Sequence, residues 1–149
     1  MSSIQTLITL YERDIDRLKN EIKSYRQETN LWRKEGNISN SAGNLCLHLI
    51  GNLKHFIGLH IGQVPYERDR DGEFSNKDIP RGDMIAEIEG TKTIVSKALS
   101  TLSDDDLNKD YPIEFGGNTP TIAYILIAMQ SHLGYHLGQI NYHRRLLDQ

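Results

Sequence analysis

Cysteine is nearly absent from the sequence. Cys46 is the only cysteine in 149 residues, so the chain cannot form an internal disulfide. Disulfide frameworks are typical of small secreted domains, whereas intracellular proteins keep their thiols reduced. We therefore expect a cytoplasmic protein in which Cys46 is a small core residue.

Long apolar runs and clusters of basic residues are also missing. No stretch reaches the roughly 18 apolar residues that a membrane span requires, and the first ~25 residues are too charged for a signal peptide. The formal net charge is -3, and the lysines and arginines form no phosphate-neutralising face. We expect neither a membrane partner nor a nucleic-acid partner.

Several catalytic motifs are absent too. Leu133 follows the first histidine of the HxxxH pair at His132 and His136, so the chain lacks the glutamate of an HExxH metalloprotease. It contains no ExxH pair, which di-iron bundles use. It also lacks a GxSxG elbow, a GxGxxG fingerprint and a P-loop. These absences exclude the corresponding enzyme types.

Helical periodicity is the main pattern that the sequence does contain. Apolar residues recur alternately four and three positions apart from Ile4 to Tyr25, which predicts an amphipathic surface helix. Residues 41–61 should form a second helix, and Lys54 is its only formal charge, which indicates central burial. Its glycines are unfavourable inside a helix and predict the close approach of a neighbouring backbone.

Two further helices complete the predicted fold. One should begin at Arg81 or Gly82, and the last should run from a cap at Asn118 or Thr119, just before Pro120, to about residue 147. We therefore predict an all-α four-helix bundle with a long crossover connection, as a single domain over residues 1–149.

The crossover connection covers residues 63–81. A connection of this length is often functional or covers part of the fold, so we interpret it as a strap across one edge of the bundle. In this interpretation Phe74 anchors the strap and Arg70 pairs with an acidic neighbour. The alternative is a solvated, mobile loop.

Two predicted helices carry a polar stripe where a bundle should bury hydrocarbon. The stripes are Asn44, His48, Asn52 and His55 on the second helix, and His132, His136, Gln139 and His143 on the last. Steps of three and four residues keep each stripe on one helical face. If the two faces meet inside the bundle, their imidazoles converge, as a divalent transition metal requires.

The candidate metal ligands follow from this pattern. His132 and His136 lie one turn apart, about 5 to 6 Å at Cβ, so both can reach one ion. His48 is the candidate third ligand, with His55 and His143 as alternatives. Three neutral imidazoles leave a coordination position open, which is typical of catalytic zinc.

Amides share the two histidine faces. Asn52 and Gln139 are candidates for orienting the ligands or the substrate, and we include them as candidate catalytic residues. The alternative is a buried hydrogen-bond network, formed by these amides and Asn44, that only fixes the register of the helices.

The residues around the histidines resemble a known family. The segments are Leu47-His48-Leu49-Ile50-Gly51-Asn52-Leu53 and His132-Leu133-Gly134-Tyr135-His136-Leu137-Gly138-Gln139-Ile140. They are similar to the two histidine motifs of the DinB/YfiT-like superfamily of metal-dependent enzymes, and the likeness in helix order extends over nearly the whole chain. The resemblance implies an up-up-down-down bundle in which His48, His132 and His136 hold zinc or nickel. The chain departs from the family at Leu137, where members commonly carry an arginine that would contact an anionic substrate.

The resemblance also implies a range of activities. It suggests a metal-dependent transferase or hydrolase in which the ion activates a low-molecular-weight thiol or water toward a small-molecule substrate. The alternatives are a non-catalytic metal-binding stress-response bundle and an interaction module without a metal. Homodimers are frequent in the family, and Gly134 and Gly138 give the last helix a small-residue face at which another helix could pack.

Overall fold

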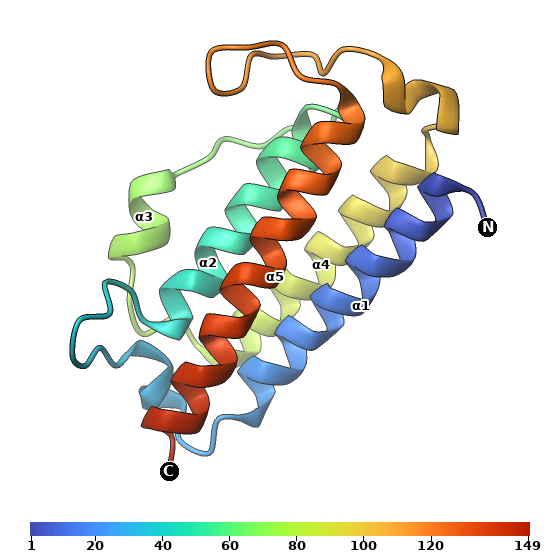
Figure 1. Cartoon of the computed structure of the whole chain (residues 1–149). Coiled ribbons are helices and arrows are strands. Elements are labelled where there is room, and N and C mark those ends of the chain that lie inside the picture. Colours follow the sequence, from blue (N-terminus) through green and yellow to red (C-terminus); the bar gives the residue numbers. More distant parts are fainter.

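Four long helices dominate the structure and lie side by side (Figure 1). The computed structural model describes all residues 1–149 and contains helices but no strands, so the all-α prediction is confirmed. The α-helices are α1 (Ser3–Ser24), α2 (Ala42–Leu53), α3 (Arg70–Ser75), α4 (Arg81–Ser100) and α5 (Ile122–Leu147). Shorter elements are the 3-10 helices η1 (Glu28–Trp32) and η3 (Asp104–Asn108) and the π-helix η2 (Lys54–Leu59), which continues α2. None of these helices has both the length and the apolar character needed to cross a membrane.

Contacts between residues of neighbouring helices fix the relative directions of the long helices. Between α1 and α5, Tyr11 contacts Leu126 and Tyr25 contacts His143. Between α1 and α4, Asp16 contacts Lys92 and Glu12 contacts Ser96. Lys54, the first residue of η2, contacts Glu87 on α4. Residue numbers rise together along α1 and α5, whereas they run in opposite senses along α1 and α4. α1 and α5 are therefore parallel to each other and antiparallel to α4.

The order of directions differs from the one that the resemblance implied. Figure 1 shows that α2 begins at the end of the molecule where α1 stops, and that α2 and α4 run in the same direction. The sequence of directions is up-down-down-up, so the up-up-down-down prediction is wrong. The physical reason is that the connection from α1 to α2 stays at one end, whereas the segment containing α3 returns the chain along the length of α2.

Side-chain caps begin three of the long helices. Ser2, Ser41 and Thr121 each accept a hydrogen bond from a main-chain N–H in the first turn of α1, α2 and α5. The predicted cap of the last helix at Asn118 or Thr119 is wrong. The Pro120 carbonyl instead accepts from the Tyr111 N–H at 2.8 Å, which keeps this segment extended until Thr121.

The core lies between the long helices and is a cluster of 26 buried hydrophobic residues. Cys46 is fully buried in it, and burial raises the pKa of its thiol to about 12. The predicted role of Cys46 as a small core residue is therefore confirmed. The buried Tyr11 keeps its hydroxyl hydrogen-bonded by donating to the Leu126 carbonyl at 2.6 Å.

The glycines of α2 and its continuation lie at close contacts. An added Cβ would come within 3.0 Å of a neighbouring group at each of them, namely Trp32 at Gly43, Glu73 at Gly51, Ile94 at Gly58 and Ala98 at Gly62. The predicted close approach is thus present, although the closest neighbours are side chains rather than backbone. The contact at Gly51 concerns the candidate site directly.

The crossover between α2 and α4 packs against α2 as a strap that includes α3 (Figure 1). Asn44 Nδ2 donates to the carbonyl oxygens of Glu73 and Asn76, at 2.9 and 2.8 Å. Arg70 does not pair with an acidic neighbour as predicted, because its guanidinium lies over the Phe74 ring, 5.4 Å from the centroid. Phe74 itself packs on His48, with ring centroids 4.8 Å apart.

Candidate metal centre

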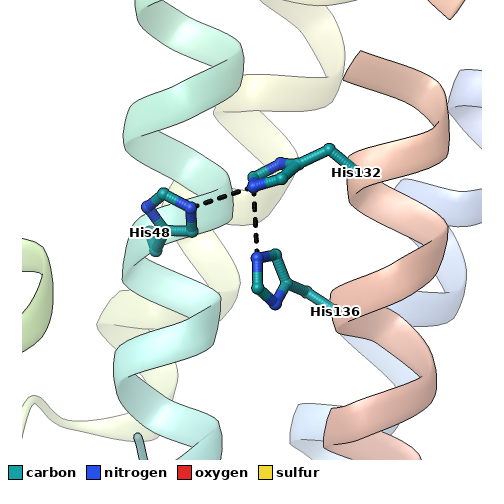
Figure 2. Close-up of side chains that lie close together, drawn as sticks. All are labelled: His48, His132 and His136. Atoms are coloured by element: carbon teal, nitrogen blue, oxygen red, sulfur yellow. Dashed lines mark hydrogen bonds between the residues drawn. The ribbon is translucent and has the colours of Figure 1, made fainter. Parts of the chain in front are cut away.

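The histidines predicted as metal ligands meet between α2 and α5 (Figure 2). His132 Nε2 lies 3.0 Å from His48 Nε2 and 3.1 Å from His136 Nε2. One ring nitrogen from each histidine can be chosen so that all three lie within 4.8 Å of one another. The structure therefore brings together His48, His132 and His136.

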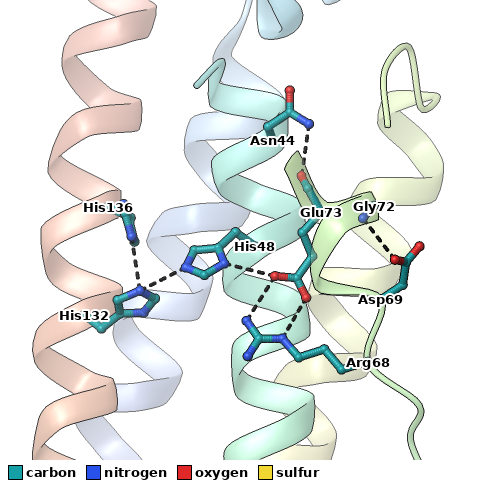
Figure 3. A network of polar contacts seen from close by, with 8 residues as sticks. All are labelled: Asn44, His48, Arg68, Asp69, Gly72, Glu73, His132 and His136. Atoms are coloured by element: carbon teal, nitrogen blue, oxygen red, sulfur yellow. Dashed lines mark hydrogen bonds and ion pairs between the residues drawn. The ribbon is translucent and has the colours of Figure 1, made fainter. Parts of the chain in front are cut away.

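Glu73 orients the ring of His48. Its Oε1 lies 2.9 Å from His48 Nδ1, and both side chains are buried (Figure 3). Because the carboxylate accepts the Nδ1–H, the other nitrogen of a neutral ring, Nε2, keeps its lone pair and faces His132. A carboxylate that holds a histidine in this tautomer is a common support for a metal ligand.

Glu73 is in turn held from two sides. Arg68 donates from Nε and Nη2 to its two carboxylate oxygens, at 2.9 and 3.0 Å (Figure 3). α3 carries Glu73 and is capped by Asp69, whose Oδ1 accepts from the Gly72 N–H at 3.0 Å. Gly51 leaves the space on α2 that the carboxylate occupies, since an added Cβ would lie 1.9 Å from Glu73 Oε2.

Gln139 orients the ring of His136 in the same way. Gln139 Oε1 lies 2.7 Å from His136 Nδ1, one turn along α5. The amide oxygen accepts the Nδ1–H, so His136 Nε2 also keeps a lone pair that faces His132. Gln139 therefore contacts a candidate ligand.

The resulting donor set suits a cation. Two lone pairs face His132 Nε2, and a neutral His132 could donate a proton to only one of them. A divalent ion would accept all three lone pairs, with the proton of His132 on Nδ1. Zinc–nitrogen bonds of about 2.0–2.1 Å in a tetrahedral site place the nitrogens about 3.3 Å apart, close to the two shortest separations found here.

The other predicted polar residues lie outside this cluster. The ring of His55 stacks edge to face against His60, with centroids 4.8 Å apart. His143 is buried, with Nδ1 2.7 Å from the Tyr25 hydroxyl and Nε2 2.8 Å from the Arg33 carbonyl, so both nitrogens are engaged. Neither of the two alternative ligands joins His48 and His132.

The two remaining amides of the α2 stripe have different surroundings. Asn44 ties the strap to α2 and makes no hydrogen bond to the candidate ligands. Asn52 lies one helical turn from His48 and is buried, and its Oδ1 has no hydrogen-bond partner in the chain. Another buried atom without a partner is His132 Nδ1. Two buried polar atoms in this region therefore have no hydrogen-bond partner in the chain, which is unusual for a folded protein.

Sequence reasoning missed Glu73 and Arg68. Both belong to the charged run of the crossover, but no periodicity indicates which of its charges turns inward. One signal was Gly51, three residues after His48, which predicted a close approach without identifying the approaching group. The other was the resemblance to the DinB/YfiT-like superfamily, which includes residues 70–74 but gives Glu73 no role.

Electrostatics favour neutral imidazoles at the site. Burial lowers the pKa of His132 to about 4, and the nearby His136 and His48 act in the same direction. Burial also lowers the pKa of His48, although the bond to Glu73 opposes this shift. Both rings are therefore unprotonated at neutral pH, which is the form that binds a metal.

These shifts predict an acid-sensitive fold in the metal-free protein. A histidine in the unfolded chain titrates near 6.5, so between pH 6.5 and about 4 the unfolded state binds a proton that His132 in the folded state does not. The contribution of His132 to stability is therefore present above pH 6.5 and is lost as the pH falls to about 4. A fully buried group with this shift would contribute about 3.4 kcal/mol, and because His132 is only half-buried we expect a smaller loss of about 2 kcal/mol in the free energy of unfolding, measured by urea titration with a chelator present.

The variant His132→Asn serves as the control for this prediction. Asparagine does not titrate in this range, so the pH dependence of unfolding should be flatter in the variant than in the wild type. The same dependence in both proteins would contradict the assignment to His132.

Comparison with known proteins identifies a family for the chain. The family model described as "Protein of unknown function (DUF1572)" matches residues 2–149. No match was found among curated proteins.

Proposed function

The chain belongs to the DUF1572 family, and we propose that it is a metal-dependent enzyme of the DinB/YfiT-like type with a four-helix-bundle fold. In this proposal His48, His132 and His136 hold one divalent ion, zinc or nickel. The observation that carries it is the convergence of three imidazole nitrogens, two of them oriented by Glu73 and Gln139.

The proposed reaction is the transfer of a low-molecular-weight thiol to a small electrophile. Three protein ligands leave at least one coordination position open. The ion, when bound, would lower the pKa of a coordinated thiol or water toward neutrality. Glu73 and Gln139 keep the histidines in the binding tautomer, and Asn52, buried one turn from His48, is the remaining candidate for orienting that ligand.

A second candidate function is metal binding without catalysis. It is favoured by the origin of the ligands, because His48 lies on α2 and the other two on α5. An ion shared by two helices would link them and stabilise the fold.

We expect the chain, purified without a histidine tag, to contain about one zinc or nickel ion per chain by elemental analysis. The loaded protein should accelerate the reaction of glutathione, cysteine or a related thiol with 1-chloro-2,4-dinitrobenzene, followed by absorbance. His136→Ala should abolish the acceleration, since it removes a ligand. A bound metal with no acceleration for any thiol would favour the second candidate.

We also propose a homodimer that packs through α5. An added Cβ at Gly134 or Gly138 would meet nothing within 4 Å, so no helix of the same chain covers this face. Tyr124 and Ile127 extend the face and are exposed, which is typical of an interaction surface. A second copy related by a two-fold axis would bury the same residues on both chains.

Light scattering at micromolar concentration should therefore return twice the chain mass of 17.0 kDa. Ile127→Asp places a charge in the interface and should give a monomer, whereas Asp83→Asn at the exposed first turn of α4 should leave the dimer intact. The mass of a single chain for the wild type would refute the dimer.

A further inference from the structure

A cavity of about 850 Å³ lies beside the candidate metal centre, between residues 35–40 and the C-terminal half of α5. Its lining includes His136 and Gln139 at one end and Leu146 and Leu147 at the other. Leu147 lies eleven positions after His136 in the same α-helix, which corresponds to about 16 Å along its axis. The cavity is thus elongated and reaches a candidate metal ligand at one end.

The wall opposite α5 is fixed at both of its ends. Arg33 Nη1 donates to the Leu147 carbonyl at 2.7 Å, and the Arg33 carbonyl lies 2.8 Å from His143 Nε2. At the other end Ser41 caps α2. Between them, the side chains of Asn37 and Ser39 line the cavity and are exposed, so they can bind a ligand without breaking a contact of the fold.

The α5 side of the cavity carries large, exposed side chains. Tyr135, Tyr142 and Leu146 are 66%, 64% and 65% exposed, although each is an apolar or aromatic residue. Leu45 adds a further apolar contact from α2. Apolar surface of this kind in a concave site is typical of ligand binding.

The cavity contains no free cation. No lysine or arginine lines it, and its only acidic group, Glu35, is paired with Arg33. His143 also lines it, but both of its nitrogens are engaged with Tyr25 and Arg33. A phosphate or carboxylate would find no charged partner along this wall.

We propose that this cavity binds the substrate, and that the substrate is a neutral, elongated molecule with an apolar or aromatic body and hydroxyl or amide groups. Its body lies on Tyr142 and Leu146, its polar groups face Asn37 and Ser39, and its reacting end lies at His136. The assignment of a reacting end rests on the proposed function, because it requires an ion at the three histidines.

Hydroxamates provide a test because their head group binds zinc. The probes are acetohydroxamate, 4-phenylbutyrohydroxamate and glutaric acid monohydroxamate, titrated calorimetrically into the zinc-loaded chain. The phenyl tail should improve affinity about tenfold over acetohydroxamate through buried apolar area, and the carboxylate tail should give no improvement. An equal gain for both tails, or none for the phenyl tail, would overturn the proposal.

Matched tyrosine variants locate the effect. Tyr142→Ser should remove the gain of the phenyl tail and leave acetohydroxamate binding unchanged. Tyr66→Ser is the control, because Tyr66 lies in the crossover, away from the α5 face proposed for the dimer, and does not line the cavity. The same loss in both variants would contradict the assigned position of the tail.

Two further measurements separate this proposal from the metal site and from the dimer. Saturation-transfer NMR with 4-phenylbutanamide, which has no metal-binding group, should detect binding that Tyr142→Ser weakens, even in a chain that fails to bind zinc. The absence of such binding would overturn the proposal independently of the metal. Leu146→Asp should weaken binding of the phenyl-tail probe without changing the mass that light scattering reports for the protein. If the variant instead converted a dimer to a monomer and bound the probe as tightly as the wild type, this face would be assigned to a second copy.

Discussion

Replacing His132 or His136 with alanine is expected to lower the affinity for zinc roughly a thousandfold while leaving the helical content largely intact. Each change removes one of three converging nitrogens, and the remaining two bind an ion weakly. Neither ring belongs to the buried hydrophobic cluster that holds the helices together. Competition with a zinc-binding dye measures the affinity, and far-ultraviolet circular dichroism measures the helicity.

Two histidines outside the triad of His48, His132 and His136 serve as controls. His55→Ala should leave zinc affinity unchanged, because this ring contacts His60 rather than the triad. His143→Ala should also spare zinc binding but should destabilise the fold by about 1–3 kcal/mol, since Tyr25 and the Arg33 carbonyl lose a buried partner. Undiminished zinc in both His132→Ala and His136→Ala would refute the metal assignment.

The triad could be predicted because it depends on local periodicity. His132 and His136 share a face of α5 for the same reason that any residues four apart do, and His48 lies on a helix that its composition marks as central. Only the meeting of the two faces required tertiary information. The pattern alone also left His55 and His143 as alternatives, and the structure separates these two from the cluster.

The direction of the helices could not be predicted in this way. Apolar periodicity specifies which face of a helix is buried, but it is the same for a helix read in either direction. The path of the strap decides the direction of α4, and the strap is held by Asn44 contacts to main-chain carbonyls, which have no sequence signature. The support of His48 by Glu73 escaped prediction for the same reason.

The importance of Glu73 can be tested through a residue that does not touch His48. Gly51→Ala places a Cβ 1.9 Å from Glu73 Oε2 and 2.6 Å from its Cδ, so the carboxylate must move. Arg68 holds both carboxylate oxygens, and Asn44 holds the main chain of Glu73, so the side chain has little room to retreat. We expect the bond to His48 Nδ1 to break and zinc affinity to fall about 10–100-fold, as for other losses of support to a ligand.

Gly90→Ala is the matched control for Gly51→Ala, because Gly90 lies within α4 and an added Cβ there meets nothing within 4 Å. It should stabilise the fold by about 0.5–1 kcal/mol through helix propensity and leave zinc affinity unchanged. Glu73→Gln removes the charge without adding volume. It should lower zinc affinity as Gly51→Ala does, and it tests the role of Glu73 even if the alanine variant folds poorly. If Gly51→Ala and Glu73→Gln both bound zinc as tightly as the wild type, Glu73 would have no part in holding His48 for the ion.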